Sequence, residues 1–204
     1  MKYIEKGSEP QSFTDWKNLA NEDWQPTYDK LGGKEKRDVK NALIAEQGGI
    51  CCYCERKLKY NDSHIEDLNP QSNSEEERLN FANFLCSCQN QLKKGEPQHC
   101  GNSKGDDILS ITPLQVDCAK KFTYTEDGYI DSVDKDSKDT IKFLQLNIDK
   151  LNSLRASVIE PFILDPITFE EISIEEAKLF AKGYLKQKDG EYNEFYTTIK
   201  YLFL

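Results

Sequence analysis

The sequence contains no long hydrophobic run. No stretch of about 18 consecutive apolar residues occurs, so we expect no membrane-spanning helix and no membrane partner. The N-terminal residues, MKYIEKGSEP, also lack the apolar segment of a secretory signal peptide. We therefore expect a cytoplasmic protein, in a compartment that keeps thiols reduced.

Basic residues are too few to give the chain a positive charge. It has 27 Lys and Arg against 36 Asp and Glu, for a net charge of −9. Proteins that bind nucleic acid unaided are usually basic, because neutralising phosphates supplies much of the affinity. If this protein acts on nucleic acid, a basic partner subunit is the simplest source of the remaining affinity.

Cysteine and histidine are concentrated in one central stretch, which holds six of the seven cysteines and both histidines. Cys51 and Cys54 have the C-x2-C spacing of a zinc knuckle, which needs a second pair of ligands to complete a tetrahedral site. We predict that Cys88 and Cys100 are this pair, with Cys86 as the alternative to Cys88. The zinc would be structural, although buried cysteines can also serve simply as small hydrophobic residues.

Polar groups suited to catalysis lie between the two cysteine pairs. The segment HIEDLNP places His64, Glu66 and Asp67 within a few residues of one another. Carboxylate and amide oxygens suit Mg²⁺, and a divalent ion beside a scissile phosphate stabilises the leaving oxygen while a nearby base activates water. The alternative is a turn whose acids are simply solvated. The further groups that we predict for such a site are two amides and one phosphate-contacting lysine: Asn83, Asn102 and Lys104.

Helical patterns flank the central stretch. Apolar residues recur at helical spacing on both sides of it, with breaks at Gly48-Gly49 and at Pro161. A turn signal at Gly128 within alternating residues predicts a β-hairpin, and Ser173 begins a capping-box sequence. The predicted elements are a helix over 34–47, one or two helices over 141–158, helices over 173–184 and 192–203, and a hairpin within 112–133.

The order of the central groups resembles that of the HNH nucleases, which bind a catalytic metal in a ββα unit. The resemblance covers residues 48–107: a C-x2-C pair, an acidic block ending in Pro, an Asn, and a cysteine-rich element ending in Asn-x-Lys-Gly. It implies Glu66 as the first metal-binding acid, Asn83 as the residue that orients the active-site loop, and Asn102 as a second metal ligand. The segment 70–72 also matches the family pattern.

A closer resemblance, over most of the chain, is to the PtuB proteins, the HNH components of Septu anti-phage systems that also accompany some retrons. It implies a nuclease that cuts nucleic acid, DNA or tRNA, with structural Zn²⁺ and catalytic Mg²⁺ or Mn²⁺. The implied partners are a PtuA-like ABC-type ATPase and a retron reverse transcriptase with its RNA–DNA hybrid. The segments that carry the resemblance are ICCYCERKL, HIEDLNPQS, NFLCSC, HCGNSKGD and LQLNIDKLNSLR.

These observations together predict a mainly helical α+β fold. We expect an N-terminal helical segment over 1–47 and a zinc-bound HNH module with a ββα-metal core over 48–110. A C-terminal hairpin and helices over 111–204 complete the predicted organisation, so that helical scaffolding flanks the module on both sides.

One position departs from the HNH pattern. The family has a His after the acid as general base, and this chain has Asp67. Asp67 is an inactivating replacement, or a natural residue that binds metal or acts as a weak base, or else His64 acts instead from the strand face of Glu66. Because Asp has a pKa of about 3.9 against about 6.5 for His, it is the poorer base at neutral pH. We expect impaired cleavage, and a zinc-bound docking module for the ATPase is the competing hypothesis.

Overall fold

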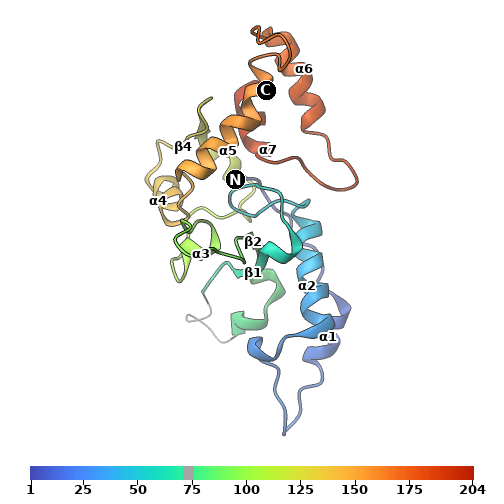
Figure 1. The fold of residues 1–204 in the computed structure, drawn as a ribbon. Coiled ribbons are helices and arrows are strands. Elements are labelled where there is room, and N and C mark those ends of the chain that lie inside the picture. The colour runs from blue at the N-terminus through green and yellow to red at the C-terminus, as the bar shows by residue number, and fades with distance from the viewer. Residues whose placement is uncertain (71–75) are drawn as a thin grey trace.

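The computed structural model describes residues 1–70 and 76–204, and it combines helices with two small antiparallel sheets. In Figure 1 the pair β1–β2 and helix α3 lie in the middle, α1 and α2 lie on one side, and α5 to α7 lie at the opposite end. The elements are α1 (Gln11–Lys17), α2 (Gly33–Glu46), β1 (Ser63–Asp67), β2 (Phe84–Cys88), α3 (Gly101–Lys104), β3 (Thr123–Tyr124), β4 (Ile130–Asp131), α4 (Lys135–Phe143), α5 (Asp149–Ile159), α6 (Ile174–Tyr184) and α7 (Tyr196–Phe203).

Helix α2 supports the central sheet. Its Val39 and Leu43 are fully buried, as the helical spacing of apolar residues predicts, and they pack with apolar residues of β1 and β2. The helix ends where Gly48 and Gly49 adopt φ angles of 66° and 75°, in the left-handed region. A Cβ on Gly48 would also lie 2.3 Å from the ring of Tyr192, so this turn excludes any larger residue.

Strand alternation in β1 separates two sets of side chains. β1 pairs antiparallel with β2, with Ile65 opposite Cys86 and Glu66 opposite Leu85. Ile65 joins the apolar cluster beneath α2, and Glu66 therefore projects from the other face of the pair. This arrangement fixes which residues of the HIED sequence can meet one another.

The C-terminal half agrees with the prediction in its elements and differs at their ends. The segment 141–158, predicted to form one or two helices, lies in two, α4 and α5, and the capping box at Ser173 is present at the start of α6. The predicted last helix begins too early, because Phe195 has a φ of 51° and α7 starts only at Tyr196. The predicted hairpin is present, but its strands have two residues each.

The three predicted segments share one hydrophobic cluster. Residues from both flanking segments pack around the central cysteines, with Ile4 from the first segment and Leu144 and Leu151 from the last. The division of the chain into three parts, with boundaries at residues 47 and 110, therefore stays a prediction. No helix in the described ranges is long and apolar enough to cross a membrane.

A buried polar network joins the β3–β4 hairpin to α5. The Asn147 side chain accepts from Ile130 N at 3.0 Å and donates to Ile130 O at 2.7 Å. Arg155, 2% exposed, donates to the carbonyl oxygens of Gly128 at 2.6 Å and Leu146 at 2.5 Å. The segment LQLNIDKLNSLR thus stabilises the fold, because its polar residues form hydrogen bonds with buried backbone groups.

Replacing Arg155 should destabilise the protein. Arg155→Met leaves two buried carbonyl groups without their donor, which should lower the free energy of unfolding by about 2–4 kcal/mol. Urea unfolding of the zinc-loaded chain measures this. Lys182→Met, at an exposed position of α6, is the matched control and should change stability by no more than about 0.5 kcal/mol. Equal stability of the two variants would contradict the structural role.

Candidate metal centre and active site

Four cysteines from three segments converge at one point. Cys51, Cys54, Cys88 and Cys100 are buried, and their sulfur atoms all lie within 4.8 Å of one another. Four sulfur atoms arranged tetrahedrally at about 2.3 Å from one metal ion lie roughly 3.8 Å apart, which is inside this limit. The residues are therefore positioned to hold a metal ion, and a set of four thiolates suits structural zinc.

The backbone brings each ligand to this centre. The Cys51–Cys54 turn is closed by hydrogen bonds from Glu55 N to Cys51 O at 3.1 Å and from Cys51 N to Arg56 O at 2.8 Å. Cys88 ends β2, and Cys100 immediately precedes α3 with a φ of 57°. A hydrogen bond from Cys100 N to Leu144 O at 2.8 Å attaches this last ligand to the C-terminal half.

The crowded sulfur atoms also shift each other's ionisation. Burial opposes ionisation of Cys51, but hydrogen bonds from neighbouring thiols, with Cys100 first, outweigh it and hold the pKa of Cys51 well below its ordinary value. Burial and the interaction with Cys51 hold the pKa of Cys100 well above its ordinary value. One thiolate is thus already stabilised, and the other ligands release protons when a metal binds.

Cys86 lies apart from this centre. It belongs to the apolar cluster beneath α2, and its backbone N–H donates to Gln47 Oε1 at 2.6 Å. Burial raises the pKa of Cys86 to about 12, as expected for a thiol among apolar residues. Cys88 is the last residue of β2, where the chain turns at Gln89 with a φ of 69°, and it reaches the other cysteines. The structure thus brings Cys88, and not the alternative Cys86, into the group of four.

Glu66 lies at the centre of the candidate active site. The carboxylate is mostly buried, and its Oε1 accepts from the Tyr53 hydroxyl at 3.2 Å and lies 3.4 Å from Lys104 Nζ. Its Oε2 lies 3.4 Å from His64 Nε2. Burial, followed by the charge of Glu66, holds the pKa of Tyr53 well above its ordinary value, so Tyr53 stays a hydrogen-bond donor to the carboxylate.

Gly101 allows α3 to approach Glu66. A Cβ at this position would lie 2.1 Å from Glu66 Oε2 and 2.8 Å from His64 Nε2, distances that atoms cannot adopt. Gly101 N donates to Ser87 Oγ at 3.1 Å, which fixes the start of α3 against β2. The sequence prediction missed Gly101 and Tyr53, whose only signal is their position beside the predicted ligands Asn102 and Cys54.

Asn83 holds the loop that follows β1. Its Oδ1 accepts from Asn69 N at 2.8 Å, its Nδ2 donates to Asn69 O at 2.9 Å, and its backbone oxygen accepts from Leu68 N at 2.9 Å. This geometry suits the loop-orienting role that the resemblance implies for Asn83. The predicted match at Gln71 and Ser72 lies outside the described residues.

Asn102 and Lys104 use their side chains within the fold. Asn102 Nδ2 donates to Gln89 O at 2.5 Å, in the loop after β2. Lys104 is 2% exposed, and besides its contact with Glu66 it donates to Asp67 O at 2.9 Å. Metal binding by Asn102 and phosphate contact by Lys104 stay predictions, and the second would require the buried Lys104 ammonium to become accessible.

Asp67 lies on the strand face opposite Glu66, at the end of β1. It is half-buried near Tyr28, a residue that the sequence prediction missed because it lies far away in the chain. Burial, with the charges of Asp67 and Glu66, raises the pKa of Tyr28 to about 12. The hydroxyl of Tyr28 is therefore a neutral group near the position where HNH nucleases have their base.

His99 lies against the cysteine centre. Its Nδ1 is 3.1 Å from Cys100 Sγ and 3.8 Å from Cys88 Sγ, and its backbone N–H donates to Gln89 Oε1 at 2.9 Å. Burial lowers the pKa of His99 to about 4, so the ring is neutral at physiological pH. The ring thus covers one side of the cysteine sulfurs and is inaccessible to a substrate.

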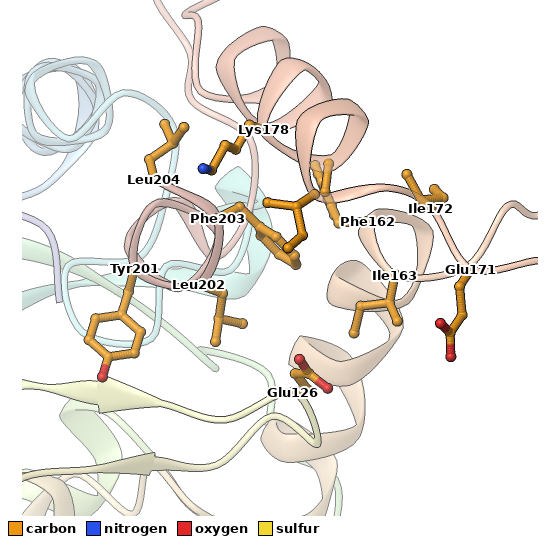
Figure 2. Close-up of a pocket in the computed structure, with 12 residues that line it drawn as sticks. Glu126, Phe162, Ile163, Glu171, Ile172, Lys178, Tyr201, Leu202, Phe203 and Leu204 are labelled. Atoms are coloured by element: carbon orange, nitrogen blue, oxygen red, sulfur yellow. The ribbon is translucent and has the colours of Figure 1, made fainter.

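A groove of about 430 Å³ lies elsewhere, between the C-terminal helices. It is mostly apolar: Figure 2 shows Phe162, Ile163, Leu202 and Phe203 along it, with Lys178 at one end. None of the predicted catalytic or metal-binding residues lines it. The candidate site is therefore the small polar region around Glu66 rather than this groove.

The fold and its cysteines define a small α+β protein with a buried glutamate and four cysteines positioned to bind a metal ion. No family model matches the sequence. One similar protein is the "Retron Vc95 putative HNH endonuclease" of Vibrio cholerae serotype O1 biovar El Tor, 29% identical over 119 residues. The match covers 57% of each chain, so this chain spans little more than half of the length of that relative.

The cysteine geometry predicts which thiols determine zinc content. We expect one zinc per chain in the purified protein, retained in Cys86→Ala and lost or strongly reduced in Cys88→Ser, since a structural site needs all four ligands. Mass-spectrometric metal analysis of the purified variants measures this. Retention of zinc by Cys88→Ser together with its loss in Cys86→Ala would reverse the ligand assignment.

Proposed function

We propose that this protein is a metal-dependent HNH endonuclease subunit of the PtuB type, which hydrolyses phosphodiester bonds of nucleic acid. The observation that carries the proposal is the position of Glu66. Its carboxylate projects from an antiparallel strand pair toward a short helix, and the four-cysteine centre links the end of β2 to the start of that helix. Along the chain the C-x2-C pair comes first, the strand pair that carries Glu66 second and helix α3 third, which is the order that the HNH resemblance implies.

Each residue of the site then has a role in the proposed hydrolysis. Glu66 Oε2, facing away from Tyr53 and Lys104, would hold a divalent cation such as Mg²⁺ or Mn²⁺, with Asn102 as a further proposed ligand. The cation, when bound, supplies charge that stabilises the phosphate transition state. Asn83 holds the loop over which the substrate passes, and position 67 is that of the base that takes the proton from water.

The charge of the chain supports a partner in this reaction. A net charge of −9 opposes binding to a polyanion, so another subunit would supply the basic surface. We propose a PtuA-like ABC-type ATPase for this role, in anti-phage defence. The retron in the name of the Vibrio cholerae relative supports a second association, with a reverse transcriptase and its RNA–DNA hybrid. DNA and tRNA are the proposed substrates.

A second function is favoured by one residue, Asp67. A carboxylate at the position of the base is almost fully ionised at neutral pH and a weak proton acceptor, and it adds negative charge where phosphate must bind. The protein would then be a zinc-bound docking module for the ATPase. Glu66 and its buried contacts favour the nuclease, because a docking module has no use for a carboxylate positioned in this way.

Restoring a histidine separates the two functions. With the proposed ATPase partner and Mn²⁺ present, Asp67→His should cleave nucleic acid about a hundredfold faster than the chain with Asp67. A positioned general base contributes about 10²–10⁴-fold to a reaction rate. The rate of the variant should fall as the pH drops through the pKa of its imidazole, about 6.5, because the protonated ring cannot accept a proton. Cleavage rates on labelled DNA and tRNA measure both effects.

Two further comparisons make this test decisive. Glu66→Gln in the Asp67→His background should abolish cleavage while zinc content stays at one per chain. Equal cleavage rates for the chain with Asp67 and for Asp67→His would show that position 67 is not the base. Absence of cleavage by every variant in every divalent metal would favour the docking module.

Gly101 should be required for the same chemistry. Gly101→Ala places a methyl group against Glu66 Oε2, so the carboxylate must move from its present position. In the Asp67→His background we expect cleavage to fall at least about tenfold, as for other small displacements of catalytic groups. The control is Gly183→Ala on α6, where a Cβ meets nothing within 4 Å, and it should keep full activity. Full activity of Gly101→Ala would contradict the position assigned to Glu66.

A further inference from the structure

We infer that His64 is a metal ligand that shares one divalent ion with Glu66, and that the pair selects a first-row transition ion over Mg²⁺. The inference rests on the proposed function in one respect, the presence of a divalent ion at Glu66. It changes the role of His64, which the sequence suggested only as a replacement base, and it names the class of ion that the site prefers.

The separation of the two side chains fits a shared ion. His64 and Glu66 are two residues apart on β1, so both side chains leave the same face of the strand. His64 Nε2 lies 3.4 Å from Glu66 Oε2. Two atoms that are each about 2.1 Å from one ion lie roughly 3.0–3.4 Å apart at angles between 90° and the tetrahedral value. The distance is also longer than a normal N–H···O hydrogen bond, of about 2.7–3.2 Å.

The two oxygens of Glu66 have different surroundings. Oε1 is held by the Tyr53 hydroxyl at 3.2 Å and faces Lys104 Nζ at 3.4 Å. Both groups are buried donors, so they fix the carboxylate and offset part of its charge. Oε2 is thereby turned toward His64, with its lone pairs on the side where an ion would bind.

Because Gly101 has no side chain, the backbone at the start of α3 can approach both proposed ligand atoms. The Cα of Gly101 lies beside both ligand atoms, since a Cβ there would be 2.1 Å from Oε2 and 2.8 Å from Nε2. Any side chain at this position would occupy the region between the imidazole and the carboxylate. The His64 side chain is 21% exposed although its Nδ1 is buried, so solvent reaches part of the imidazole ring.

The donor set determines the preferred ion. Mg²⁺ prefers oxygen ligands and binds imidazole weakly, whereas Mn²⁺ and the later first-row ions accept a mixed nitrogen and oxygen set. Asn102, the second ligand in the sequence prediction, uses its amide N–H for Gln89 O at 2.5 Å. His64 and Asn102 lie on different elements, and substitution can therefore separate their contributions.

The experiment measures metal ligation directly in the zinc-loaded chain. Mn²⁺ binding is followed by the loss of the free-ion signal in electron paramagnetic resonance, and electron spin-echo modulation detects ¹⁴N bound to Mn²⁺. The wild type should bind one Mn²⁺ with clear ¹⁴N modulation. His64→Gln should weaken Mn²⁺ binding by at least about tenfold, remove the ¹⁴N modulation, and weaken Mg²⁺ binding much less.

Matched variants assign each outcome. Glu171→Gln, which changes an exposed carboxylate in the C-terminal half, should bind Mn²⁺ as the wild type does. Absence of ¹⁴N modulation in the wild type, or its persistence in His64→Gln, overturns the inference without the need for any other variant.

Unchanged Mn²⁺ binding in His64→Gln with loss in Asn102→Ala would assign the second ligand to Asn102 instead. Unchanged binding in Glu66→Gln would overturn the proposed active site itself, and zinc content of one per chain confirms that each variant is folded.

Discussion

The convergence of four cysteines is the constraint on which the rest of the structure depends. The ligands come from three separate segments: the turn at Cys51–Cys54, the end of β2 and the residue before α3. Cys100 lies directly before Gly101, so the position of the metal also fixes the start of α3 against the face of β1. A metal ion held by these cysteines would thus determine the space around Glu66. This coupling explains why four metal-binding cysteines and a candidate catalytic carboxylate occur in the same short stretch.

The electrostatics of the site follow from its burial. An ionised carboxylate is costly to bury unless donors surround it, and Tyr53 and Lys104 provide such donors at one oxygen of Glu66. Lys104 is itself buried and also needs acceptors, which Glu66 and Asp67 O supply. The opposite charges of Glu66 and Lys104 therefore stabilise each other without occupying the second carboxylate oxygen of Glu66. Lys104, for which the sequence predicts a phosphate contact, is in this structure an internal partner of the acid.

The sequence predicted those parts of the site that depend on local spacing. The C-x2-C pair, the strand at His64 to Glu66 and the glycine end of α2 are properties of neighbouring residues, and all three are present. The choice between Cys86 and Cys88 depends on where β2 ends and which of its faces packs on α2, and that is known only once the strands pair. Tyr28 and Gly101 were missed for a related reason. Their importance comes from what lies beside them in space: Tyr28 has no signal in its own sequence neighbourhood, and Gly101 has only its position next to predicted ligands.

Strand alternation also bears on the departure at Asp67. His64 and Glu66 lie on one face of β1, and Asp67 lies on the other, near Tyr28 and the helix α2 side of the sheet. The HIED sequence thus places the proposed metal ligands on one face of the strand and the proposed position of the base on the other. In the proposed mechanism, a change at residue 67 alters proton transfer and leaves the carboxylate and its buried donors as they are. A missing base and a missing metal site would therefore be separate defects in this fold, so that slow cleavage would be compatible with undiminished binding of a divalent ion.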